Sequence, residues 1–70
     1  MITANKREKL AKKLLKISAS AKDKVVYRTR HGIDDGITRS NEETGKIFNM
    51  TGEAVRQILI KIDNLIDDNL

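Results

Sequence analysis

Apolar side chains recur along the chain at three- and four-residue steps, the spacing of one face of an α-helix. The first such stretch covers residues 4–17; its apolar positions are Leu10, Ala11, Leu14, Leu15 and Ile17, and lysines occupy many of the remaining positions. The strongest periodicity begins after residue 51, at Val55, Ile58, Leu59, Ile62, Leu65 and Ile66. The pattern predicts one amphipathic helix near each end of the chain.

A second helix is expected over residues 21–31, where Val25, Val26 and Tyr27 are the apolar residues. Ser20 is placed to cap its start, since a serine hydroxyl accepts from the first free backbone N–H groups. Gly32 is placed to end it, because glycine readily takes the left-handed conformation of a helix C-terminus. A turn and loop to about residue 39 follow.

A third, short helix is expected from Asn41 to about Phe48. Ser40 and Glu43 have the spacing of a capping box, in which each side chain bonds the backbone of the other residue. A turn over residues 49–51 comes next, and Thr51 is placed to cap the last helix. A short helix, a tight turn and a longer amphipathic helix predict a helix-turn-helix, and a structural helical hairpin fits the same pattern.

The expected fold class is all-α, a small three- to four-helix bundle containing a helix-turn-helix and no β wing. The 70 residues are 39% hydrophobic, with one Phe, one Tyr and no Trp, so the core has to be small and aliphatic. No proline and no low-complexity tract divides the chain. We therefore expect a single packed unit.

Charge is distributed unevenly along the chain, which has a net charge of +4. Residues 1–31 contain ten Lys and Arg against two acidic residues, and residues 32–70 contain four against eight. The two parts therefore carry +8 and −4. Such polarity indicates a polyanion on the basic side, most simply nucleic acid, and a merely solvated basic helix is the alternative.

Sites for other chemistry are not apparent in the sequence. The chain has no cysteine and one histidine, His31, which is too little for an ordinary metal site. No nucleophile with an adjacent base and no phosphate-binding glycine loop is present, so we expect neither an enzyme nor a cofactor. Apolar runs are too short for a membrane span, and with no cysteine this favours a cytoplasmic protein without a membrane partner.

Three motifs together resemble region 4 of the primary, sigma-70-type bacterial sigma factors. They are Arg28-Thr29-Arg30-His31-Gly32-Ile33, then Glu42-Glu43-Thr44-Gly45, then Thr51-Gly52-Glu53-Ala54-Val55-Arg56-Gln57-Ile58. The resemblance covers about residues 20–66. It implies a helix-turn-helix domain over residues 20–70, preceded by a basic N-terminal helix over residues 1–19 that either packs on the domain or projects as an arm.

The resemblance also implies a function, recognition of minus-35-type double-stranded promoter DNA. It carries base reading in the major groove onto Glu53, Arg56 and Gln57, whose side chains suit cytosine, guanine and adenine edges respectively. It carries contacts to DNA phosphates, which give affinity without sequence information, onto Lys22, Arg28, Arg30 and Thr51. His31 stands where the family has an aromatic residue and should pack at its helix end, where the helix dipole favours a protonated ring.

A second partner implied by the resemblance is the flap of the RNA polymerase β subunit, which region 4 binds in an apolar groove. Candidate residues here are Ile37, Ile47, Leu59 and Ile60. A core role or a homodimer seam is the alternative for them. Further partners that such a module could take are a second sigma-like subunit and an anti-sigma protein.

Four positions depart from the family pattern. Gly52 and Ala54 stand where arginine is usual, which lowers the expected DNA affinity, and Thr44 and Asp63 stand where the family has apolar residues. A protein-interaction module with weak or no DNA specificity is therefore the alternative function, and a helix-turn-helix repressor that dimerises is a third. The chain could be an excised domain, a split-sigma subunit or a phage-type regulator of the polymerase.

Overall fold

The computed structural model describes residues 2–68, and this part of the chain contains helices and no strand. Residue 1 of the expected N-terminal segment and residues 69 and 70 of the expected domain lie outside the described residues. The helices are α1 (Ala4–Lys16), α2 (Ala21–His31), α3 (Asn41–Phe48) and α4 (Gly52–Asp68). The predicted all-α fold is confirmed, and each helix falls within a residue or two of its expected range.

Hydroxyl side chains cap the helices as the sequence predicts. The Ser20 Oγ accepts from the backbone N–H of Asp23 over 3.1 Å. Ser40 and Glu43 form the full capping box, with the Ser40 Oγ accepting from the Glu43 N–H and the Glu43 carboxylate accepting from the Ser40 N–H. Thr51 caps α4 through its Oγ1, which accepts from the N–H of Ala54 over 3.1 Å. These bonds fix the residues at which α2, α3 and α4 begin.

Gly32 ends α2 in the left-handed conformation, with φ 66°. A Cβ at this position would lie 2.6 Å from the backbone carbon of Ile37, so the loop after α2 folds back over the space that a side chain would fill. Asp35 and Arg39 hold this loop further: they pair with each other over 2.8 Å, and Arg39 also donates to the carbonyl of Thr29. The loop that leads into α3 is thereby closely packed.

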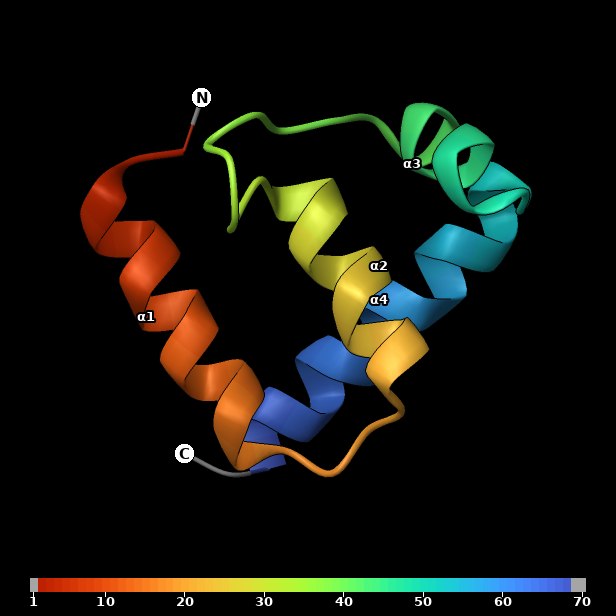
Figure 1. Cartoon of the computed structure of the whole chain (residues 1–70). Coiled ribbons are helices and arrows are strands. Elements are labelled where there is room, and N and C mark those ends of the chain that lie inside the picture. The colour runs from red at the N-terminus through yellow and green to blue at the C-terminus, as the bar shows by residue number, and fades with distance from the viewer. Residues whose placement is uncertain (1, 69–70) are drawn as a thin grey trace.

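One aliphatic core joins three helices and the loop after α2. Its buried members are Leu14, Ile17, Tyr27, Ile33, Ile62 and Ile66. Figure 1 shows α4 passing behind α2 and ending beside the last turn of α1. The first helix therefore packs on the body and does not project as an arm. The division of the chain at residue 19, into an added helix and a family-like part, stays a prediction.

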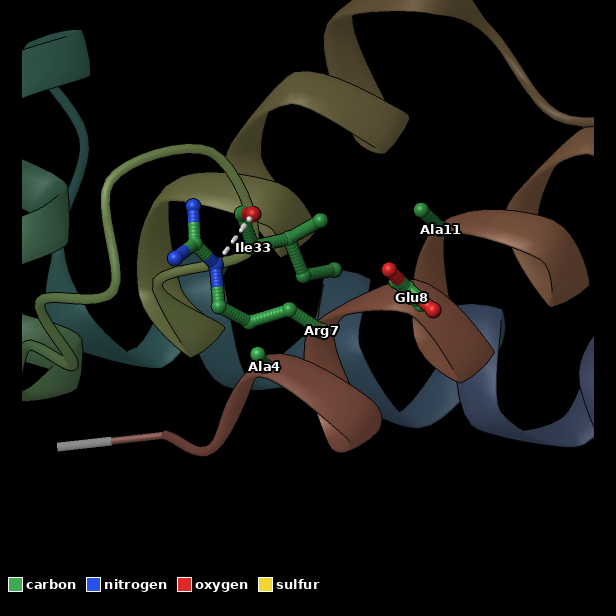
Figure 2. Close-up of a pocket in the computed structure, with 5 residues that line it drawn as sticks. All are labelled: Ala4, Arg7, Glu8, Ala11 and Ile33. Carbon is green, nitrogen blue, oxygen red and sulfur yellow. Dashed lines mark hydrogen bonds between the residues drawn. The ribbon is translucent and has the colours of Figure 1, made fainter.

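Arg7 ties the first half of α1 to the loop after α2. Its Nε donates to the carbonyl of Ile33 over 3.0 Å, and its Nη2 donates to the carbonyl of Asp34 over 2.7 Å. A pocket of about 330 Å³ lies along this seam, lined by Ala4, Arg7, Glu8, Ala11 and Ile33 (Figure 2). Because its guanidinium bonds backbone carbonyls, Arg7 has a structural role in addition to its charge.

The last two helices form the predicted helix-turn-helix. α3 lies at one end of the molecule, against the start of α4 (Figure 1), and Val55 of α4 is fully buried there. Asn49 leaves α3 in the left-handed conformation, and the N–H of Met50 donates back to the carbonyl of Gly45 over 2.7 Å. A Cβ on Gly45 would stand 2.4 Å from the Met50 carbonyl oxygen. The tight turn therefore depends on glycine at position 45.

Candidate nucleic-acid interface

The start of α4 presents a polar face away from the core. Val55 and Ile62 are fully buried, while Glu53, Arg56 and Gln57 are exposed. Their separations of three and four residues place the three exposed side chains beside one another on the helix surface. The structure thus brings together all three residues expected to read bases. None of them supports the core, so the face can enter a groove without unpacking the fold.

These three side chains bond one another and form a recognition cluster of Glu53, Arg56 and Gln57. Arg56 donates to the Glu53 carboxylate from Nε over 2.9 Å and from Nη2 over 2.7 Å, and Gln57 donates from Nε2 over 3.0 Å. The hydrogen bonds from Arg56, and secondly from Gln57, lower the pKa of Glu53 to about 2. Glu53 is therefore ionised at any physiological pH and orients both neighbours.

The recognition cluster keeps capacity for further bonds. A guanidinium has five N–H donors, of which Glu53 engages Nε and one on Nη2, and the Gln57 amide oxygen is an acceptor that no bond within residues 2–68 engages. Donors and acceptors can therefore face base edges while the Glu53 contacts persist. A fork of Arg56 onto guanine can use the end of the guanidinium, Nη1 and the second N–H of Nη2, which Glu53 leaves free.

Thr51 lies at the N-terminus of α4, next to the recognition cluster. Its oxygen accepts from the Ala54 N–H, so the hydroxyl hydrogen is left to donate outward. The free backbone N–H groups of the first turn and the helix dipole favour an anion at this end. The geometry suits the phosphate contact that the family resemblance assigns to Thr51.

Two of the expected phosphate-binding residues have intramolecular partners. Arg28 forms an ion pair with Asp34, and this contact raises the pKa of Arg28 and lowers that of Asp34. Arg30 donates from Nε to the Oδ1 of Asn41 over 2.8 Å, so its side chain lies at the N-terminus of α3. Lys22 is exposed and makes no bond to another described residue. Lys22 is therefore wholly available to a phosphate, while Arg28 and Arg30 can offer the N–H groups that these contacts leave free.

The lysines of α1 form a further basic surface. Lys6, Lys9, Lys12 and Lys16 are exposed, and none pairs with a carboxylate in the described part of the chain. They share α1 with Leu14, whose burial fixes the helix on the body. This surface belongs to a rigid element and not to a loose tail.

The four candidate flap-binding residues lie in different environments. Leu59 packs against the core, whereas Ile37, Ile47 and Ile60 are 53%, 57% and 42% exposed. Ile37 belongs to the loop before α3, Ile47 to α3 and Ile60 to the outward face of α4. The described contacts do not gather the four into one groove.

His31 packs at the end of α2, in the slot that the sequence suggests for an aromatic ring. Its ring lies 4.4 Å from that of Tyr27, and its Nε2 is buried without a partner among the described residues. Burial, followed by the charge of Arg30, lowers the pKa of His31. The dipole effect expected from the sequence is therefore outweighed, and the neutral ring is favoured.

Three polar residues that hold the site in place could not be singled out from the sequence. Arg7 bonds backbone carbonyls of the loop between α2 and α3, and Arg39 bonds the carbonyls of Thr29 in α2 and of Ile37 in that loop. Lys61 donates to Asp23 over 2.8 Å and links α4 to the start of α2. The partners of Arg7 and Lys61 depend on how α1, α2 and α4 come together in space, and those of Arg39 depend on how the loop folds back onto α2, so helix periodicity does not identify them.

Two sigma factors are among the known proteins that are similar to this chain. The chain is 47% identical over 55 residues to RNA polymerase sigma factor SigA of Nostoc sp., a match that covers 79% of the chain. It is 46% identical over 54 residues to RNA polymerase sigma factor SigA of Clostridium acetobutylicum, covering 74% of the chain. The resemblance to sigma factors is thereby confirmed.

The sigma-like chain spans about 14% of the length of each of these relatives. Its four helices and helix-turn-helix are consistent with a fragment like sigma-70 region 4. No profile of a known protein family matches the chain. No solved structure matches it either.

Proposed function

We propose that this chain is a transcription module that binds minus-35-type promoter DNA through α4 and the β flap of RNA polymerase through exposed apolar side chains. It acts by binding and not as an enzyme, and its place of action is then the cytoplasm. The observation that carries the proposal is the recognition cluster of Glu53, Arg56 and Gln57, which stands exposed at the start of the second helix of a helix-turn-helix.

The chemistry of the recognition cluster supports sequence reading. An arginine can donate two bonds to guanine, a glutamine can pair with adenine, and a carboxylate can accept from cytosine. The contacts from Arg56 and Gln57 to Glu53 hold all three side chains in one cluster, so these side chains lose less conformational entropy when DNA binds. Base discrimination requires exposed side chains whose positions relative to one another are fixed.

Charge along α4 supports one orientation on DNA. Its first turns carry Glu53 and Arg56, whose charges cancel, together with the Thr51 cap and the positive end of the helix dipole, while its last turn carries Asp67 and Asp68 and no basic residue. A polyanion is attracted to the first end and repelled from the second. The DNA is therefore expected against the N-terminal turns, as in other helix-turn-helix proteins.

The second candidate function is a protein-interaction module that retains the fold but binds DNA weakly. Gly52 and Ala54 supply no charge beside the recognition cluster, and Arg28 and Arg30 already have intramolecular partners. Ile37 and Ile47 are more than half exposed, which suits an apolar partner such as the polymerase flap, a sigma-like subunit or an anti-sigma protein.

DNA binding by matched variants tests the leading proposal. A duplex is first selected by the wild-type chain from a randomised pool, and affinities are then measured over a series of salt concentrations. We expect Arg56→Ala to cost about 1–3 kcal/mol on the selected duplex and little on a scrambled one. Lys12→Gln should weaken both duplexes alike and reduce the salt dependence. Equal losses on both duplexes for Arg56→Ala would refute base reading.

Capture of polymerase separates the two candidates. Purified RNA polymerase and its isolated β flap are passed over the immobilised chain, with Ile37→Glu and Ile47→Glu as surface variants. The leading proposal predicts flap capture together with selective DNA binding. Capture of the flap without DNA selectivity favours the interaction module. If the wild-type chain captures no flap, the flap is excluded as a partner in both candidate functions.

A further inference from the structure

The outward face of α4 carries one large apolar side chain among polar ones. Ile60 is 42% exposed and follows Arg56 by four residues and Gln57 by three. At these separations the three side chains are neighbours on one side of the helix. Asn64 comes four residues later and is exposed as well. Ile60 therefore extends the recognition cluster by one turn.

Two contacts to α2 establish the direction of this face. The Nζ of Lys61 donates to the Oδ2 of Asp23 over 2.8 Å, and the Tyr27 hydroxyl donates to the Oδ1 of Asp63 over 2.9 Å. Lys61 and Asp63 thus border the part of α4 that faces α2. With about 100° of rotation per residue, Ile60 falls in the remaining arc, on the side away from α2.

The surroundings of Ile60 distinguish it from the other apolar residues. Leu59, its neighbour in sequence, packs against the core. Arg56, Gln57 and Asn64 surround Ile60 on its own face with polar groups. An apolar groove that covered this face would take water away from Arg56, Gln57 and Asn64 and would offer no partner to the donors and acceptors that Glu53 leaves free. A surface that is polar overall and apolar at one point fits better.

We propose that Ile60 contacts the 5-methyl group of one thymine when α4 enters the major groove, and so adds a base preference next to that of the recognition cluster. The inference rests on the proposed DNA binding by α4. The thymine methyl is the apolar group that bases display in the major groove. From Glu53 to Ile60 the helix rises about 10 Å, which is within the roughly 12 Å width of that groove.

Removal of single methyl groups from the DNA tests this contact. Each thymine of the selected duplex is replaced in turn by deoxyuridine, which lacks only the 5-methyl group. The wild-type chain should lose roughly fourfold in affinity at one position, the equivalent of one buried methyl group. Ile60→Ala should show no further loss at that position. Leu15→Ala truncates an exposed apolar side chain on α1 instead and should respond as the wild type does.

The outcomes separate this inference from the proposal on which it rests. A duplex that is selected but insensitive to every deoxyuridine overturns the Ile60 contact and leaves DNA reading intact. The same loss in Ile60→Ala as in the wild type also overturns it. Weaker polymerase capture by Ile60→Ala with unchanged DNA binding assigns the residue to a protein partner instead. Failure to select any duplex overturns the proposed function and the Ile60 contact together.

Discussion

Tyr27 of α2 donates its phenolic hydroxyl to the carboxylate of Asp63 on α4, over 2.9 Å. The ring of Tyr27 is buried in the core, while Asp63 is exposed. Asp63 stands where the resemblance to sigma factors leads one to expect leucine. The contact gives this departure a structural reason, because the carboxylate provides the partner that a largely buried hydroxyl needs.

Tyr27→Phe should lower the free energy of unfolding by about 1 kcal/mol at neutral pH, since it removes one hydrogen bond and leaves Asp63 in water. Burial, and secondly Asp63, raise the pKa of Tyr27 above its ordinary value of 10.0. The unfolded chain therefore ionises first, and this part of the stability is lost as the pH rises above 10.0. Denaturant titrations at neutral and alkaline pH should show the extra loss in the wild type and not in Tyr27→Phe.

Thr44 is fully buried in the helix-turn-helix, and its hydroxyl has no hydrogen-bond partner within residues 2–68. Thr44→Val replaces the hydroxyl with a methyl group of similar size. We expect the free energy of unfolding to rise by about 1 kcal/mol, because the cost of burying an unpaired hydroxyl is removed. Thr44→Ser keeps the hydroxyl and removes the methyl group, so it should lower stability. A less stable Thr44→Val protein would show that the hydroxyl is satisfied in solution.

Two glycines of the helix-turn-helix should respond to alanine in opposite directions. A Cβ on Gly45 meets the Met50 carbonyl oxygen at 2.4 Å, so Gly45→Ala should cost about 1–3 kcal/mol of stability. A Cβ on Gly52 meets only the flexible side chain of Glu42, at 3.0 Å. Gly52→Ala should therefore gain up to about 1 kcal/mol from helix propensity. Thermal unfolding of both variants checks the pair, and a gain for Gly45→Ala would contradict the turn geometry.

His31 should make the stability depend on pH on the acid side. Burial and the charges of Arg30 and Lys6 lower its pKa below the ordinary 6.5, against a smaller opposite effect of Asp63. The unfolded chain therefore binds the proton first, so the contribution of the neutral ring is complete above pH 6.5 and is lost as the pH falls below it. His31→Phe should remove this part of the acid loss. Parallel stability curves for both proteins below pH 6.5 would show that the ring does not contribute.

Local signals predicted the elements well, because caps and apolar periodicity act within a few residues. Ser20, Ser40 and Thr51 begin helices through bonds to residues three positions away. Placement of α1 could not be predicted in this way, since it depends on Arg7 bonding carbonyls 26 and 27 residues later. The sequence left its docking open for that reason.

In the candidate site, too, local spacing predicts some features, and others depend on contacts between distant residues. Glu53, Arg56 and Gln57 are close in sequence, so their shared face could be predicted from helix spacing. The pairing of Arg28 with Asp34 and of Arg30 with Asn41 depends on how the loop after α2 folds, so it could not be predicted from helix spacing. Leu59 and Ile60 are both among the residues expected at the polymerase flap, yet adjacent residues on a helix face different directions.

The most direct test of the account follows the backbone amides of the folded chain by NMR while the selected promoter duplex is added. We expect the largest chemical-shift changes on residues 51–60, around the recognition cluster of Glu53, Arg56 and Gln57, and small changes at Ile37. Arg56→Ala should reduce them on the selected duplex. Changes confined to α1, or changes of equal size with a scrambled duplex, would contradict the claim that α4 reads DNA.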